Sequence, residues 1–439
     1  MTPPVAGVAT PVPSHGEHPV PSPTHLPRLL ASAATGPALD AHLALHGPLP
    51  AFAPASRGSH PLVELIERAG LTGRGGAGFP TARKLAAVAR GRGGAVVVAN
   101  GVEAEPVSAK DTVLCRLAPH LVLDGAQLAA AAVGATRIVV VVHGAVGEVL
   151  RDAVAERARC AMDGVSAEIL DAATHFVAGE ESAVVNWVDR GRSVPTGSDH
   201  RPFERGGAGR PTLVNNVETL AHVALIARHG DEWFRSLGTP AEPGTLLVTA
   251  RGAVSRPGVY EAALGSRLDD VVRAAGGLLA PASAFLVGGY FGTWIDGTTT
   301  EVELSRQGLA PLGASVGAGL LLAVPSSCCG VVETARLARY LAGQSAGQCG
   351  PCVFGLRAIA DELGLLARCG TLPQGTSRLR RWLGEVDGRG ACAHPDGVVR
   401  LVRSALSVFA GEVERHANGR CSAARPEQSA LGLPSVLGA

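Results

Sequence analysis

The sequence predicts an α/β domain, then a smaller domain of short strands, then a helical domain. Three observations indicate this order. Between about residues 60 and 240, apolar strand-like runs alternate with helical stretches, which is the α/β pattern. From about 245 to 325 the runs shorten to strands and turns around one helix. From 333 to 413 helical spacing of apolar residues dominates, as in Leu356, Ile359 and Leu363.

The predicted elements follow from the same patterns. A first stretch, residues 1–25, is rich in Pro, Ser and His, and we predict that it is disordered. We place the three domains at 26–240, 241–325 and 326–425, with a flexible tail at 426–439. In the α/β domain we predict a helix over 61–69 and strands at 95–99, 138–142 and 165–170. In the second domain we predict strands at 245–249, 256–261 and 284–289 and a helix over 268–275.

The composition excludes several functional classes. Lys and Arg number 39 against 38 Asp and Glu, so no net positive field attracts nucleic acid. The longest apolar stretch, near 121–142, is interrupted by Gln127 and Arg137 and predicts a helix followed by a buried strand, with no transmembrane segment. The N-terminus lacks the basic and apolar segments of a secretory signal. We therefore expect a cytoplasmic protein, whose nine cysteines are metal ligands or free thiols and not disulfides.

The run from Gly73 to Lys84, GRGGAGFPTARK, is the most informative motif. Four glycines in six positions let a backbone approach a bulky anion closely, and Lys84 adds a positive charge. The run also satisfies the G-x-G-x-x-G dinucleotide fingerprint, but that fingerprint follows a strand. Here the preceding segment has helical spacing. We therefore predict a phosphate-binding loop that is not a Rossmann turn.

Five motifs occur in an order that resembles one protein family: GRGGAGFPTARK, ANGVEAEPVSAKD, AGEESAVVNW, GRPTLVNNVETLAHV and GQCGPC. Together they resemble the NADH-oxidising, FMN-containing subunit of respiratory complex I and its relatives in NAD-linked hydrogenases and formate dehydrogenases. The resemblance covers roughly residues 60 to 415. It implies a flavin-binding α/β domain, a soluble-ligand-binding β-grasp domain, and a C-terminal helical bundle that holds an iron-sulfur cluster.

The resemblance also implies a set of cofactor-binding residues. FMN needs backbone amides for its phosphate, a nearby cation, and polar side chains for its ring and ribityl hydroxyls. By the resemblance, the residues at the FMN and NADH sites are Gly73, Arg74, Gly75, Gly76, Phe79, Lys84, Asn100, Glu103, Glu105, Gly179, Glu180, Glu181, Phe203, Asn215 and Asn216. The glutamates would orient NADH and tune hydride transfer, and no side chain serves as a catalytic acid or base. The alternative is a turn-rich loop beside a solvated acidic face.

Three departures concern NADH. The family stacks the adenine between phenylalanines, and Phe79 and Phe203 match two of those positions, although ordinary core packing is the alternative for each. A third aromatic is replaced by Ala86, a family aspartate by Val102, and a family tyrosine by Phe176. Loss of a stacking wall is worth about 0.5–1.5 kcal/mol beyond burial, so we expect weaker or altered dinucleotide binding.

The cluster motif departs most sharply. The family supplies C-x-x-C-x-x-C and a fourth, distant cysteine to a cubane cluster. Here Cys349, Cys352 and Cys392 match three ligands, and Ala346 replaces the first. The alternatives are a three-iron cluster, a four-iron cluster with an outside ligand, and no cluster; we favour a cluster. The candidate outside ligands are Ser345, His394, Cys328, Cys329 and hydroxide. The remaining cysteines, Cys115, Cys160, Cys369 and Cys421, are interpreted as buried or free thiols, and no histidine spacing indicates a metal site.

The resemblance implies a flavoprotein oxidoreductase. Hydride would pass from NADH to FMN, and single electrons would pass to a cluster of 4Fe-4S or 3Fe-4S type and then to a redox partner. That partner is expected to be a ferredoxin-like or thioredoxin-like iron-sulfur subunit or a membrane reductase, which would make the chain peripheral to the membrane. Two alternatives remain open: a scaffold or weakly active relay in a redox complex, and a related electron-bifurcating or ion-pumping subunit.

Overall fold

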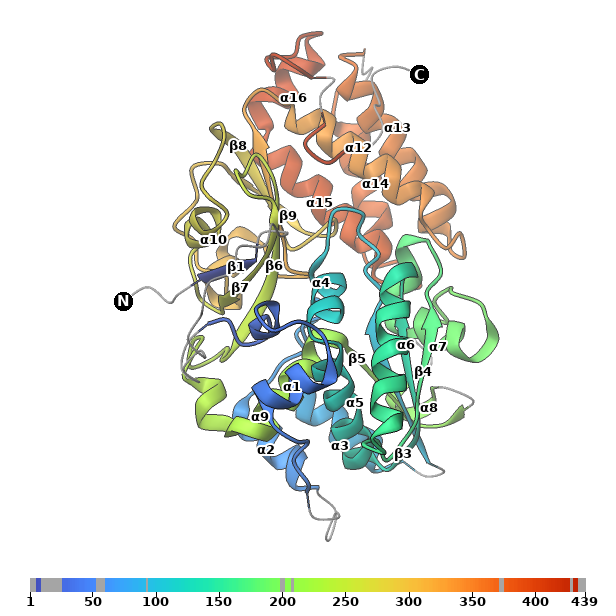
Figure 1. Cartoon of the computed structure of the whole chain (residues 1–439). Coiled ribbons are helices and arrows are strands. Elements are labelled where there is room, and N and C mark those ends of the chain that lie inside the picture. The colour runs from blue at the N-terminus through green and yellow to red at the C-terminus, as the bar shows by residue number, and fades with distance from the viewer. Residues whose placement is uncertain are drawn as a thin grey trace. The chain divides into compact units, whose positions relative to one another are not determined.

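A computed structural model describes residues 5–8, 26–52, 60–91, 94–197, 202–206, 209–370, 375–426 and 429–432 of the 439-residue chain. The chain, drawn whole in Figure 1, divides into two compact units. Unit 1 comprises residues 1–174, 178–248 and 258–266, and unit 2 comprises 175–177, 249–257 and 267–439. Among the described residues, no helix is both long enough and apolar enough to span a membrane.

Unit 1 is built on a parallel four-stranded sheet with the strand order β4-β3-β2-β5. The strands are β2 (Ala95–Gly101), β3 (Ala135–Val142), β4 (Ala167–Asp171) and β5 (Thr212–Asn216). The chain runs outward from β2 to β3 and β4 and then returns to place β5 on the other side of β2. The boundary between β2 and β5 is therefore the topological switch point of the sheet, and ligands of open α/β sheets bind at the carboxyl ends of strands there.

Apolar side chains cover both faces of this sheet. Val97 and Val140 point into a large core with helices α2, α3, α5 and α9, whereas Val98 and Val141 point into a smaller core with α7. Continuous β-branched runs suit strands that are buried on both faces, which explains why the predicted strands are found. The helices of unit 1 are α1 (Leu39–His46), α2 (Pro61–Ala69), α3 (Thr81–Ala89), α4 (Lys110–Leu117), α5 (Pro119–Val133), α6 (Gly144–Arg159), α7 (Glu181–Arg190), α8 (Pro202–Arg205) and α9 (Val217–Arg235).

A second sheet has the strand order β1-β7-β6-β10-β8-β9, and the division between the units passes through β6. Its strands are β1 (Val5–Val8), β6 (Thr245–Gly252), β7 (Gly258–Ala263), β8 (Ala282–Val287), β9 (Thr293–Asp296) and β10 (Leu320–Pro325). In the sequence, helix α10 (Leu268–Ala274) lies between β7 and β8, and helix α11 (Arg306–Leu309) lies between β9 and β10. Strand β1 pairs antiparallel with β7, so Val5–Val8 depart from the disorder predicted for residues 1–25. The other residues of that segment lie outside the described residues.

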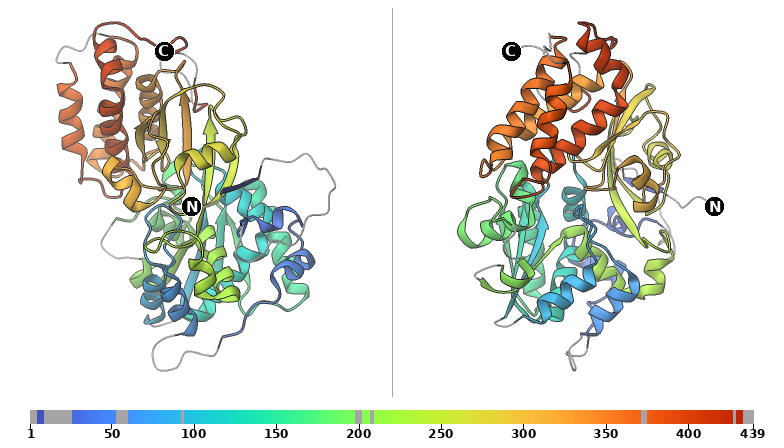
Figure 2. Two further views of the ribbon diagram at one scale, coloured as in Figure 1. Left: turned by 90° about the vertical axis from the view of Figure 1, so that its left-hand side faces the viewer. Right: turned by 180° about the vertical axis from the view of Figure 1, so that it is seen from behind.

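The C-terminal part of unit 2 is helical, as predicted. It contains α12 (Gly330–Gly343), α13 (Leu356–Ala367), α14 (Ser377–Val386), α15 (His394–Val408) and α16 (Ala410–Ala417). These helices lie side by side in both views of Figure 2. Helices α12, α13 and α15 contribute the buried leucines Leu337, Leu363 and Leu401, respectively. A π-helical turn, Pro351–Gly355, leads into α13 and carries Cys352. Single π-turns often occur at functional sites.

Candidate functional site

The glycine-rich run forms a closed loop at the start of α3. Thr72 and Pro80 form an antiparallel bridge, and the Gly73 amide donates to the Phe79 carbonyl at 2.9 Å. Gly76 has φ +112° and Gly78 has φ +61°, which are conformations that favour glycine. A Cβ on Gly75 would lie 3.3 Å from Cβ of Asn216, so the loop closely approaches the end of β5. The loop therefore lies beside the switch point of the sheet.

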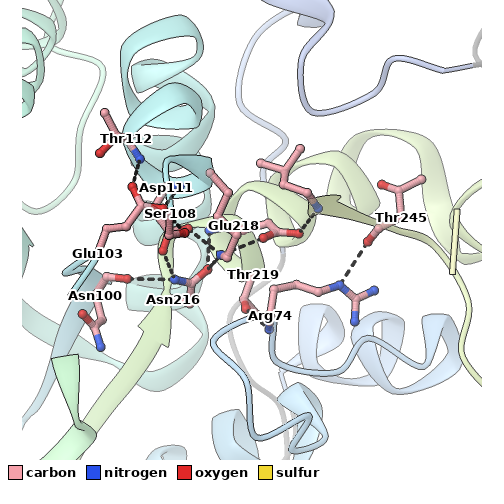
Figure 3. Close-up of polar contacts among 12 residues, drawn as sticks. Arg74, Asn100, Glu103, Ser108, Asp111, Thr112, Asn216, Glu218, Thr219 and Thr245 are labelled. Carbon is pink, nitrogen blue, oxygen red and sulfur yellow. Dashed lines mark hydrogen bonds and ion pairs between the residues drawn. The ribbon is translucent and has the colours of Figure 1, made fainter. Parts of the chain in front are cut away.

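Arg74 anchors this loop from within unit 1. Its side chain is buried and donates to the carbonyls of Thr72 (3.1 Å) and Pro243 (3.2 Å). It also donates to the Thr245 carbonyl at 3.0 Å, and its own amide donates to Oγ1 of Thr219 at 2.9 Å (Figure 3). Burial lowers the pKa of Arg74, although Glu218 and Glu242 act against that shift. The guanidinium is thus engaged by the protein. The Arg74 amide is engaged too, by Thr219, so the contacts of Arg74 hold the loop in shape.

Three asparagines lie at the carboxyl ends of β2 and β5. Asn100 is the strand partner of Asn216, and Ala99 is the partner of Asn215. Asn216 caps α9 by accepting from the Glu218 amide at 3.0 Å, and it donates to the Asn100 carbonyl at 3.2 Å. Asn215 is buried, and within the described parts of the chain its Nδ2 has no hydrogen-bond partner. Burying an unpaired amide is costly, so Asn215 fits a ligand that supplies an acceptor.

A buried charge network lies behind these asparagines. Nζ of Lys110 is 2.7 Å from Asp111 and 2.9 Å from Glu218. Asp111 accepts from Nδ2 of Asn216 at 2.8 Å (Figure 3). Burial alone would lower the pKa of Lys110, but the two carboxylates outweigh it and raise that pKa. Sequence reasoning missed Lys110, Asp111 and Glu218 as a set. The only available signal was that all three lie inside the quoted motifs.

Two of the predicted acidic residues are held by helix amides. Glu103 accepts from the amides of Asp111 (3.3 Å) and Thr112 (3.1 Å) at the start of α4, and from the Ser108 hydroxyl at 2.7 Å. Burial, reinforced by Asp111, raises the pKa of Glu103. Glu180 caps α7 by accepting from the Ala183 amide at 2.9 Å. These contacts position helix N-termini.

The other two glutamates differ in their surroundings. Glu105 is half-buried in the turn before α4, where its carbonyl accepts from the Ser108 amide at 3.0 Å. Glu181 begins α7, and its side chain, 37% exposed, lies 2.9 Å from Nζ of Lys84. Lys84 also donates to the Val214 carbonyl at 3.0 Å, next to Asn215. Gly179 lies close by, because its carbonyl accepts from Nδ2 of Asn100 at 3.0 Å.

In unit 2, the three remaining cluster cysteines gather around the π-helical turn. The thiols of Cys349 and Cys352 are hydrogen-bonded to each other, and Cys392 lies close enough to raise the pKa of Cys352. Burial is the main cause of that rise, which takes the pKa of Cys352 to about 12. Burial acts in the same direction on Cys349, but backbone amides of Ala391 and Cys352 outweigh it and lower the pKa. Three converging sulfurs with amide donors fit an iron-sulfur cluster.

Three family models match this chain. Residues 66–225 match the Nuo51 FMN-binding domain, residues 247–289 match the SLBB domain, and residues 333–416 match the NADH-ubiquinone oxidoreductase-F iron-sulfur binding region. The F subunit of NADH-quinone oxidoreductase from Mycobacterium tuberculosis is 31% identical over 389 residues, which cover 84% of this chain and 87% of that protein. The chain belongs to the F-subunit family.

Other relatives extend the comparison. The F subunit of Escherichia coli is 30% identical over 373 residues, covering 80% of this chain and 83% of that protein. A crystal structure of an NAD+-reducing NiFe hydrogenase in the H2-reduced state matches with a TM-score of 0.75 and 31% identity. The match covers 81% of this chain, which spans 62% of the hydrogenase chain. The predicted family is confirmed, and with it the predicted class: an NADH oxidoreductase with FMN-binding and iron-sulfur domains.

The residues predicted at the NADH site, and those that replace family residues there, differ in exposure. Phe79 is 46% exposed at the end of the glycine loop, as a stacking surface requires. Phe203 packs against the main core of unit 1, which favours the core-packing alternative, and Ala86 packs there too. Val102 is buried, and Phe176 is buried among aromatic rings of unit 2, with Phe291 at 4.8 Å between centroids. Of the two predicted adenine walls, Phe79 is exposed and Phe203 is half-buried.

Two of the outside ligands considered for the family's fourth cluster position are engaged elsewhere. His394 is buried, with Nε2 2.9 Å from the Leu341 carbonyl. Cys329 Sγ lies 3.3 Å from Nε2 of His416. Ser345 and Ala346 are half-buried in the cluster loop, and Cys328 is buried. These contacts make Cys329 a poor candidate for the missing cluster ligand, whereas His394 keeps a buried Nδ1 with no hydrogen-bond partner among the described residues.

Proposed function

We propose that this chain oxidises NADH at a flavin site in unit 1 and delivers electrons to a redox partner through a cluster on Cys349, Cys352 and Cys392. The observation that carries the flavin site is the unpaired amide of Asn215, buried at the switch point beside the glycine loop. Bound FMN supplies hydride acceptance and the conversion from two-electron to one-electron transfer. The chain's own residues supply binding, orientation and charge.

Each flavin-site residue has a role that its contacts support. The amides of Gly75 and Gly76 would receive the phosphate, with Lys84 as the nearby cation. Gly73 and Arg74, whose amides donate to Phe79 and Thr219, would hold the loop in shape. Asn215 would donate through its free Nδ2. Asn216 links the end of β5 to β2 through the Asn100 carbonyl, and the Asn100 side chain links β2 to Gly179, so both would position the site.

NADH would lie against Phe79, the exposed aromatic of the loop. Glu181 would face the adenosine ribose, where a carboxylate repels a 2′-phosphate. Its pair with Lys84 keeps it in place at the start of α7. Glu105 and Gly179 would line the nucleotide path. Glu103 and Glu180 would act through the helices whose amides they accept, and Phe203 through core packing.

Purified protein should contain noncovalent FMN and not FAD, and NADH should bleach it faster than NADPH. One glycine loop with Lys84 suits a single terminal phosphate. Extracted flavin is compared with standards, and stopped-flow absorbance measures reduction by each nucleotide.

Glu181→Gln should reduce the ratio of the flavin reduction rate with NADH to that with NADPH. The matched change Glu168→Gln, on an exposed ion pair, should leave this ratio unchanged. Recovery of FAD would contradict the site, faster NADPH would contradict the role of Glu181, and no reduction by either would favour the scaffold alternative.

For unit 2, we infer that α12 to α16 form a helical bundle whose cluster has three cysteine ligands. Ala346 leaves one iron of a cubane without a protein thiolate, and that iron is the one most easily lost. We also infer a partner that accepts single electrons, an iron-sulfur subunit or a membrane reductase, and association with the membrane only through such a partner.

The cluster should be oxygen-labile and isolated mainly in a three-iron form. Low-temperature EPR tests this, because an oxidised three-iron cluster is paramagnetic and an oxidised low-potential cubane is silent. Reconstitution with iron and sulfide should restore four irons, and Ala346→Cys should make the four-iron form persist in air. Ala342→Cys, four residues earlier in the sequence and near the end of α12, is the matched control and should not. Absence of iron after anaerobic reconstitution, in protein that retains FMN, would show that the three cysteines hold no cluster.

A further inference from the structure

A second group of metal-ligating side chains lies in unit 2, apart from the three cluster cysteines. Its members are Cys329, Glu412, His416 and Cys421, and their ligand atoms all lie within 4.8 Å of one another. Cys329 immediately precedes α12, Glu412 and His416 are one turn apart on α16, and Cys421 lies in the segment that follows α16. Residues about ninety positions apart in sequence therefore converge on one point.

The distances fit tetrahedral coordination. Nε2 of His416 lies 3.3 Å from Sγ of Cys329 and 3.2 Å from Oε1 of Glu412. Ligand atoms bound at 2.0–2.3 Å to a tetrahedral zinc ion are about 3.2–3.8 Å apart. The thiol of Cys421 is hydrogen-bonded to both Cys329 and Glu412. The four side chains thus surround a space of the size that one ion requires.

The tautomer of His416 supports a cation at this point. His416 is completely buried, and its Nδ1 is 2.9 Å from the Leu366 carbonyl, so Nδ1 carries a proton and donates it there. The lone pair on Nε2 then faces Oε1 of Glu412, which already accepts from the Ser422 amide at 2.8 Å. Nε2 and Oε1 at 3.2 Å need either a proton on Nε2 or a metal ion between them. A hydrogen bond from Nδ1 to a carbonyl is also the usual outer contact of a metal-bound histidine.

We propose that Cys329, Glu412, His416 and Cys421 form a structural Zn²⁺ site. Two sulfurs, one imidazole nitrogen and one carboxylate oxygen match zinc, whereas Mg²⁺ and Ca²⁺ prefer all-oxygen sites. The ion would link the start of α12 to α16 and to the segment after it. Cys369 does not belong to the site, because its Sγ lies beside Nδ1 of His416 at 3.6 Å, away from the ligand nitrogen. The proposal is independent of the flavin and cluster assignments.

Zinc content of the full-length protein tests the site. Inductively coupled plasma mass spectrometry should find about one zinc per chain, in addition to iron. Cys329→Ser, His416→Asn and Cys421→Ser should each reduce zinc at least about tenfold and lower the melting temperature, with flavin content unchanged. Cys328→Ser, which changes the neighbouring buried cysteine, should retain zinc. Cys349→Ser should also retain it, which separates this site from the cluster loop.

Cobalt gives a second readout that does not depend on the stability of a variant. Co²⁺ bound in place of zinc should show thiolate-to-cobalt charge-transfer absorption in the wild type and in Cys349→Ser. Failure to retain zinc or cobalt after incubation and gel filtration would overturn the proposal. So would equal zinc loss in Cys328→Ser, or a Cys329–Cys421 disulfide in the native protein by mass spectrometry.

Discussion

Gly76→Val should abolish flavin retention, with occupancy falling at least about tenfold. Gly76 has φ +112°, a conformation that a β-branched residue adopts only with strain, so the loop would have to change its path. The added side chain would also occupy the approach of the phosphate. Flavin absorbance per chain after gel filtration measures the effect.

A matched variant separates loop geometry from general destabilisation. Gly134 also has positive φ, at +64°, at the end of α5, and a Cβ there would meet nothing within 4 Å. Gly134→Val should therefore lower the melting temperature but leave flavin occupancy near that of the wild type. Normal flavin content in Gly76→Val, or equal loss in both variants, would place the flavin site elsewhere.

Lys110→Met should destabilise unit 1 by about 3–5 kcal/mol, because it leaves Asp111 and Glu218 buried without their cation. Chemical unfolding of unit 1, followed by the fluorescence of Trp187 and Trp233, measures the loss. The matched control is Arg137→Met, which removes an exposed ion pair with Glu168 and should cost about 1 kcal/mol or less. The double variant Lys110→Met, Glu218→Gln should recover part of the loss. Similar losses of stability in Lys110→Met and Arg137→Met would contradict the role of Lys110.

Much of the fold could be predicted because its core strands are uninterrupted apolar runs. The predicted strands 138–142 and 95–99 fall inside β3 and β2, and the helix predicted over 61–69 coincides with α2. Strands β1, β5, β9 and β10 were not predicted. Strands β1 and β9 have only four residues each, and their positions are specified by pairing with β7 and β8.

The candidate site was predicted only in part, for a different reason. Sequence identifies a carboxylate but not whether the protein's own amides already satisfy it. Glu103 and Glu180 were interpreted as nucleotide contacts, yet they accept from the first turns of α4 and α7. An acidic residue directly before a helix, as Glu180 is, is a recognisable cap signal. The convergence of Cys329 with His416 had no such signal, because tertiary packing alone brings α12 and α16 together.

The unpaired amide of Asn215 bears on how much of the protein accumulates in a cell. If flavin binds at Asn215 as proposed, a chain without flavin leaves a buried donor unpaired at a cost of about 1–3 kcal/mol, and the bound flavin adds stability by mass action. We therefore expect newly made chains to be most exposed to proteases before they load the cofactor. Steady-state abundance would then follow the supply of flavin, so that incomplete molecules are removed before they compete for a place in a larger assembly.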